Sequence, residues 1–168
     1  LRGNISPGNI CVANEGYIQG KALVGLRTST SPNNGYTNTS AKYQRIYCLT
    51  YDPDKNEWTR IKIRSGYSTK DYLEYQSTQI YLDEVQFVQV ATDQYILSAR
   101  SDASGNRLFY RLTFTSDTQA TATMISQSGM NLANPCNGDL IKYAAKDGTQ
   151  YILHTVPKDM VYGSNNCR

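Results

Sequence analysis

The chain has 168 residues, of which 39% are hydrophobic, 11% aromatic and only 18% charged, and its formal net charge is +3. This length suits one ordinary globular domain, and the aromatic content with little like-charge repulsion excludes a disordered chain. No run of about 20 apolar residues occurs, which excludes a membrane-spanning helix, and the scattered Lys and Arg residues form no basic block of the kind that binds nucleic acid.

The first half of the chain is predicted to consist of short strands separated by clusters of Gly, Asn, Asp and Ser. The β-rich segments are residues 9–13, 21–28, 43–51 and 58–63. Residues 58–63 alternate between apolar and polar side chains, as a half-buried strand does. Loops are expected at residues 29–41, which contain Ser-Pro-Asn-Asn-Gly, and at residues 52–56, which read Asp-Pro-Asp-Lys-Asn.

The second half continues the same pattern. A turn or two of helix is expected within residues 70–79, but no segment carries a sustained helical stripe. Further strands are predicted at residues 85–90, 94–101, 107–115, 120–126, 139–144 and 150–157. The predicted fold class is therefore all-β.

Three of these segments are counterparts in a repeat, namely residues 21–28, 94–101 and 150–157. Each follows another β-rich stretch, and the first two are followed by two further predicted strands. Four-stranded antiparallel units that recur at about this period are typical of β-propeller blades. A β-sandwich is the alternative architecture.

The repeat divides the chain into a unit at about residues 1–66, a second at about 80–130 and the start of a third at 135–168. Propellers close with about four to eight blades, and an open array would leave long unpaired edge strands. We therefore expect these residues to be part of a larger polypeptide.

The four cysteines lie far apart in the sequence, at Cys11, Cys48, Cys136 and Cys167. No Cys-x-x-Cys motif occurs and the single histidine is His154, which argues against a zinc site. Four cysteines allow three disulfide pairings, and the sequence does not choose among them.

Two triplets match the acceptor motif for N-glycosylation, beginning at Asn4 and at Asn38. Pro7 follows directly after the first of them and weakens it. The two motifs favour an extracellular or cell-surface location.

Three segments, in this order, carry a family resemblance. Residues 5–58 contain Pro7-Gly8, the turn Asn-Glu-Gly-Tyr at 14–17, and an approach to Trp58 that resembles an Asp-box lacking its Ser, Gly and Thr. Residues 84–100 (EVQFVQVATDQYILSAR) resemble a Glu-x-Gln-x-Val segment that runs through a strand to an Arg. Residues 135–157 are similar to a Cys-Gln-x-Ser-x-Ile segment followed by a Phe-Ser-Asn-Pro strand.

Taken together, these segments resemble the bacterial-type sialidases, the exo-α-sialidases and related trans-sialidases, which are six-bladed β-propellers. The chain would correspond to about blades three to five. The resemblance implies a glycoside hydrolase that releases terminal sialic acid from glycoconjugates and needs no metal or organic cofactor. Sialylated glycans and the remaining blades of the same polypeptide are the implied partners.

The resemblance also implies roles for three residues. Glu84 falls at the position of the Glu that draws the proton from a nucleophilic Tyr, and these enzymes are the Tyr-nucleophile exception among glycosidases. Arg100 and Arg168 fall at the positions of two of the three Arg that bind the substrate carboxylate, which suits the guanidinium fork. In the family an Arg and the acid/base Asp precede this region and the nucleophilic Tyr follows it, so activity is expected only in a longer polypeptide.

Other interpretations of the same residues remain open. Glu84 and Arg100 could form a structural ion pair, and His154 is expected to be a packed strand residue and not a catalyst. A non-catalytic extracellular carbohydrate-binding or structural module on the same scaffold is the alternative function, favoured by the degenerate Asp-box and the missing catalytic residues. A β-sandwich lectin is a third reading.

Overall fold

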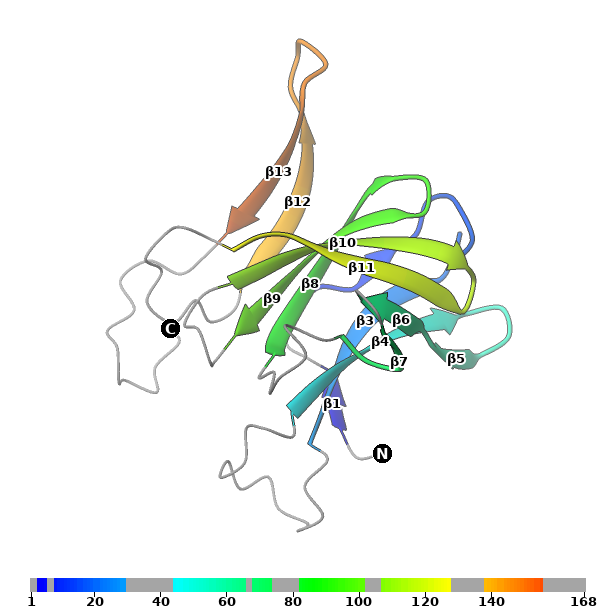
Figure 1. Ribbon diagram of the computed structural model, residues 1–168. Helices are drawn as coiled ribbons and strands as arrows, with labels where there is room; N and C mark the ends of the chain where they lie inside the picture. Colours follow the sequence, from blue (N-terminus) through cyan, green and yellow to red (C-terminus); the bar gives the residue numbers. More distant parts are fainter. Residues whose placement is uncertain are drawn as a thin grey trace.

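The computed structural model describes residues 3–5, 8–29, 44–65, 68–73, 82–101, 107–127 and 138–155 (Figure 1). This part of the chain contains strands and turns without a helix, and the predicted all-β class is confirmed. None of it is a helix long and apolar enough to cross a membrane. Most of the loop expected at residues 29–41 and most of the segment at 70–79 lie outside the described residues, as do Cys136, Cys167 and Arg168.

The first sheet has five strands and is built around one long central pair. Its strands are β1 (Gly3–Ile5), β2 (Cys11–Val12), β3 (Ala22–Ser29), β4 (Gln44–Asp52) and β5 (Glu57–Arg60). β3, β4 and β5 form an antiparallel meander, and β1 and β2 pair with opposite ends of β3. Because β4 occupies the other edge of β3, β1 and β2 together act as one interrupted edge strand.

The second sheet has six strands and the third has two. The second contains β6 (Lys62–Ser65), β7 (Ser68–Lys70), β8 (Leu82–Ala91), β9 (Gln94–Ser101), β10 (Arg107–Ser116) and β11 (Gln119–Gln127). β8 to β11 form an antiparallel meander, and the third sheet is the antiparallel hairpin of β12 (Asp139–Ala144) and β13 (Gln150–Thr155). The three repeat counterparts, β3, β9 and β13, therefore each pair with the strand that precedes them, as the repeat predicts.

One predicted strand is wrong, because residues 58–63 do not form a single strand. The strand is interrupted at Ile61. The N–H of Ile61 donates to Cys48 O in the first sheet at 2.9 Å, whereas the N–H of Lys62 donates to Thr118 O, beside the second sheet, at 2.9 Å. From there β6 joins the second sheet and runs parallel to β11. The apolar alternation is satisfied on both sides of the break, since Ile61 and Ile63 are both fully buried, so the pattern alone could not reveal the change of sheet.

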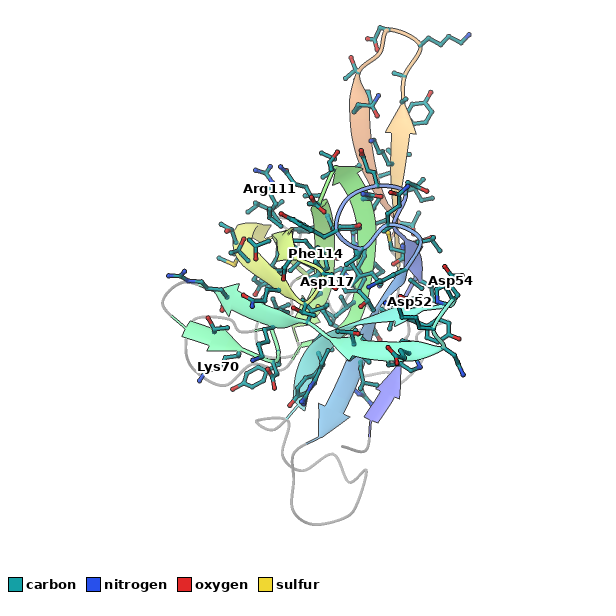
Figure 2. The ribbon with its side chains drawn as sticks, turned by 90° about the vertical axis from the view of Figure 1, so that its right-hand side faces the viewer. Asp52, Asp54, Lys70, Arg111, Phe114 and Asp117 are labelled. Atoms are coloured by element: carbon teal, nitrogen blue, oxygen red, sulfur yellow. The ribbon has the colours of Figure 1, made fainter. Side chains whose placement is uncertain are left out.

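The turn expected at residues 52–56 is confirmed, and it joins β4 to β5. Asp52 Oδ1 accepts hydrogen bonds from the N–H groups of Asp54 at 3.1 Å and Lys55 at 3.3 Å, which is the local bonding that makes Asp favourable in turns. Figure 2 shows Asp52 and Asp54 together at this end of the first sheet. Asn56 completes the turn with a left-handed φ of 54°, a conformation that Asn tolerates better than most residues.

The core lies where the first two sheets meet, along β8. This strand contacts β2, β3 and β4 on one side of the molecule and β12 on the other (Figure 1). Glycines allow the close approach: a Cβ on Gly8 would lie 1.9 Å from Val85 O, and one on Gly25 would lie 3.1 Å from Val85 Cβ. The fully buried apolar side chains include Leu23, Ile46, Ile61, Ile63, Leu97, Leu108 and Leu112.

Side-chain hydrogen bonds join the loop around β2 to the edge of β8. Asn9 imitates a backbone partner, because its Nδ2 donates to Phe87 O at 2.7 Å and its Oδ1 accepts from Phe87 N at 2.7 Å. In the opposite direction, the side chain of Gln89 on β8 bonds the main chain of the loop: its Oε1 accepts from Asn14 N at 2.7 Å and its Nε2 donates to Glu15 O at 3.0 Å. The Asn9 bonds satisfy main-chain groups of an edge strand that would otherwise be open to another strand, and the Gln89 bonds fix the loop against it.

Replacing Asn9 by alanine is expected to lower the free energy of unfolding by about 1–3 kcal/mol, because the N–H and C=O of Phe87 would both lose their partner. Urea denaturation of the parent and of Asn9→Ala measures the difference. Gln19→Ala is the matched control, since Gln19 is an exposed residue of the same loop. Equal stability of Asn9→Ala and the parent would contradict the assignment.

Candidate functional site

Glu84 lies at an irregularity in the pairing of β8 with β9. Asp83 pairs with Arg100 and Gln86 with Ser98, so Glu84 and Val85 share the space opposite a single residue of β9. The φ angle of Glu84 is +46°, in the left-handed region that side chains other than Gly adopt at a cost of about 1–2 kcal/mol. Such bulges and backbone outliers concentrate at functional sites, where the surroundings hold them in place.

Arg100 is in direct contact with Glu84. Its Nη1 donates to Glu84 Oε1 at 3.0 Å, and the two side chains retain 18% and 8% of their exposure. The bond is charge-assisted and therefore among the stronger protein hydrogen bonds. The two residues that the sequence assigned to one site are thus brought together, where β8 begins and β9 ends.

Arg107 belongs to the same cluster, although no pattern in the sequence singled it out. This residue begins β10, pairs across the strands with Arg100, and is completely buried. Its Nε donates to Ser98 Oγ at 2.7 Å and its Nη2 to Glu84 O at 2.5 Å. Nη2 also donates to Gln86 Oε1, and Nη1 lies 3.9 Å from Glu84 Oε2.

The local sequence carried little signal for Arg107. Leu108, Tyr110, Leu112 and Phe114 are buried with the period of a half-exposed strand, which puts Arg107 on the face where a charge is ordinarily solvated. In the folded protein Arg107 is instead fully buried, with hydrogen bonds to Ser98, Glu84 and Gln86. A register for the β9–β10 pair, had it been predictable, would have placed the two arginines side by side.

In this cluster the Glu84 carboxylate lies between the guanidinium groups of Arg100 and Arg107. Arg107 is inaccessible, whereas Arg100 is partly exposed and able to contact a bound molecule. A carboxylate in this setting can accept a proton or hydrogen bond from a hydroxyl brought close to it, and a guanidinium can bind an anionic group. Within the described ranges no three His, Cys, Asp or Glu side chains converge in a way that could hold a metal ion.

His154, on β13, packs beside this cluster. Its ring meets Phe109 edge-on, with the ring centroids 5.3 Å apart and the planes at 88°. Its Nε2 is buried and has no hydrogen-bond partner among the described residues. Burial first, and the charge of Arg107 second, lower the pKa of His154 to about 4, with a smaller opposing effect from Asp139. The imidazole is neutral at neutral pH, as expected of a packed strand residue.

The lowered pKa of His154 predicts a loss of stability in acid. The unfolded chain protonates this histidine near pH 6.5 and the folded protein only near pH 4, so the unfolded state gains protons first and the free energy of unfolding falls between these two values. The contribution is constant above pH 6.5. Chemical denaturation at a series of pH values measures it, and His154→Phe should remove this part of the acid dependence. An unchanged pH dependence in the variant would contradict the prediction.

Cys11 and Cys48 are free thiols. Burial raises the pKa of Cys48 to about 12 and also raises that of Cys11, where a hydrogen bond from the backbone of Gln89 acts in the opposite direction. Both thiols therefore stay protonated at neutral pH and are poor nucleophiles. Cys136 and Cys167, the other two cysteines of the possible disulfide pairings, lie outside the described residues.

The structure thus joins Glu84 and Arg100, adds Arg107, and leaves Arg168 outside the described residues. Comparison of the chain with protein-family models, with curated proteins and with solved structures finds no match.

Proposed function

We propose that the chain is a segment of a sialidase-type β-propeller glycosidase that releases terminal sialic acid from glycoconjugates at the cell surface or outside the cell. The observation that carries the proposal is the contact between Glu84 and Arg100 at 3.0 Å, at a left-handed bulge of β8. These are the two residues of the resemblance that the described part of the chain contains, and a strained, partly buried charge pair is a common feature of binding sites.

The architecture supports the proposal. β2 to β5 and β8 to β11 are successive antiparallel meanders, and β12 and β13 begin a third. Their first strands lie near one another, because β8 contacts β2 and β12, and β8 packs against β3 and β4 as well. Blades arranged around a common axis bring their first strands together in this way. The six-bladed ring itself is part of the proposal.

One face of the β12–β13 hairpin supports the presence of further blades. The pairs Ile141–Leu153 and Tyr143–Tyr151 lie opposite each other across β12 and β13, which puts all four side chains on one face. They are 47–50% exposed, while Leu140 on the other face is buried. A contiguous exposed apolar patch of this kind is typical of a surface that another layer covers, and we assign the covering layer to further blades of the same polypeptide.

The chemistry of the substrate suits the cluster. Sialic acid carries a carboxylate on its anomeric carbon, and a guanidinium binds such a group through charge-assisted hydrogen bonds. Arg100, with Arg168 as a second cation, would hold this carboxylate, and Glu84 would accept the proton of a Tyr nucleophile. A carboxylate nucleophile would be repelled by the substrate, whereas a Tyr is not. The Tyr, the acid/base Asp and a further Arg come from other parts of the polypeptide, and no cofactor is needed.

Arg100→Ala in the complete polypeptide tests the proposed function. Hydrolysis of a fluorogenic sialoside is expected to lose about 100-fold or more in kcat/KM, because a charged hydrogen-bond pair with the substrate is removed. Arg111→Ala is the control, since Arg111 lies exposed on β10 of the same sheet (Figure 2). Activity of Arg100→Ala within a fewfold of the parent would overturn the assignment.

A non-catalytic extracellular glycan-binding or structural module is the second candidate. The observation that favours it is the engagement of Glu84 by both Arg100 and Arg107, which a purely structural ion pair also explains. The flanking sequence separates the two candidates. An upstream Arg and Asp and a downstream Tyr favour the enzyme, whereas their absence favours the binding module.

A further inference from the structure

We propose that Arg107 is a positioning residue that holds the Glu84 carboxylate in its working orientation without touching the substrate. This inference rests on the proposed function, because it assigns the device that orders the same site. Three features support it: the burial of Arg107, its hydrogen bond to the Glu84 backbone, and the position of Arg100 and Arg107 beside different oxygens of the Glu84 carboxylate.

Burial separates the roles of the two arginines. Arg107 has no exposed surface, whereas the Arg100 side chain keeps 18% of its exposure. Only Arg100 can therefore meet a molecule that arrives from solvent. An influence of Arg107 on a substrate would therefore be indirect, and Glu84 is the charged group that contacts both arginines.

Arg107 also fixes the backbone of the bulge. Its Nη2 donates to the carbonyl oxygen of Glu84 at 2.5 Å and to the side-chain oxygen of Gln86, on the far side of the irregular pairing. Its Nε donates to Ser98 Oγ at 2.7 Å, which ties the guanidinium to β9. A residue at φ +46° needs such support, because its conformation is unfavourable by itself.

Each oxygen of the Glu84 carboxylate lies near a different guanidinium group. Arg100 Nη1 is 3.0 Å from Glu84 Oε1, and Arg107 Nη1 is 3.9 Å from Oε2. Arg100 hydrogen-bonds one oxygen, and the positive charge of Arg107 near the other favours this orientation of the carboxylate. When Arg100 engages a substrate anion, Arg107 would keep Glu84 in place.

The chemistry of the contacts calls for arginine. A guanidinium has five N–H donors in a planar fork, and here its nitrogens reach a hydroxyl, an amide oxygen, a carbonyl and a carboxylate. A lysine ammonium has three donors on a flexible stem and cannot reach these acceptors together. Arg107→Lys therefore keeps the charge and removes the geometry.

The test compares Arg107→Lys with Arg100→Lys in the complete polypeptide, using a fluorogenic sialoside over a range of pH. Arg107→Lys is expected to lower kcat by about 10- to 100-fold and to shift the acid limb of the kcat–pH profile, with KM nearly unchanged. Arg100→Lys is expected to raise KM. Arg111→Lys, an exposed substitution on the same strand, is the control and should match the parent.

Two results would overturn the positioning role. One is a folded Arg107→Lys protein with the parental kcat and pH profile, and the other is an Arg107→Lys effect confined to KM. If Arg107→Lys fails to fold, Ser98→Ala is the variant that tests the positioning role, because it removes only the acceptor of Arg107 Nε. A smaller change of kcat and pH profile in the same direction supports the proposal, and parental values overturn it.

The same experiment distinguishes this inference from the proposed function. Parental activity of Arg100→Ala would mean that the proposed function fails. Impaired Arg100→Ala together with parental behaviour of Arg107→Lys would mean that the function stands and only the positioning role fails.

Discussion

Replacing Glu84 by alanine is expected to lower the free energy of unfolding by about 3–5 kcal/mol. The substitution removes the carboxylate that lies beside Arg107, which has no exposed surface, and leaves that guanidinium with less compensation in the interior. Arg100 loses its 3.0 Å bond at the same time. Removing one member of a buried charge pair costs more than the pair itself contributes, because the remaining charge stays out of water.

Guanidinium denaturation of Glu84→Ala and the parent measures this loss, with Glu57→Ala as the control at an exposed position of β5. A double-mutant cycle with Arg107→Met isolates the interaction, and a coupling energy above about 1 kcal/mol is expected between contacting residues. A loss below about 1 kcal/mol for Glu84→Ala would show that the cluster does not stabilise the fold.

Phe87→Ala is expected to cost about 3–5 kcal/mol in the free energy of unfolding, since it empties a site in the core. Phe87 lies on β8, keeps only 1% of its exposure and belongs to the main apolar cluster. Its main chain is held by Asn9 through two bonds of 2.7 Å, which limits the extent to which β8 can collapse into the space. The cavity should therefore persist.

Thermal and chemical unfolding of Phe87→Ala give this value, and Ile10→Ala supplies the comparison because Ile10 is 63% exposed. The control is expected to change stability by less than about 0.5 kcal/mol. Similar losses for the two variants would contradict the assignment of Phe87 to the core between the sheets.

Much of the strand pattern follows from local sequence. β9 and β12 begin and end where predicted, at Gln94–Ser101 and Asp139–Ala144. In both cases a β-rich run is bounded by turn residues, and in the β8–β9 turn Asp93 adopts a left-handed φ of 59°. Turn chemistry and β propensity act over a few residues, so the sequence alone can locate such boundaries.

Pairing partners were not predictable in the same way. Residues 58–63 look like one strand, yet the chain changes sheets at Ile61 and β6 pairs with β11, far away in the sequence. The apolar residues of β13 match those of buried strands, yet Tyr151 and Leu153 are 48% and 47% exposed. Burial depends on what lies opposite a strand, and alternation carries no information about that neighbour.

The candidate site, too, was predictable only in its local features. The amino-acid sequence by itself determined an all-β chain and most strand positions, and the family resemblance singled out Glu84 and Arg100, which the structure places in contact. Only the tertiary structure decided that Glu84 occupies a strained bulge, that its two oxygens face different guanidinium groups, and that Arg107 is buried beneath it. The physical reason is that conformation and desolvation at this site arise from the register of three strands, β8, β9 and β10. Strand register is a long-range property, whereas propensity and turn chemistry are local.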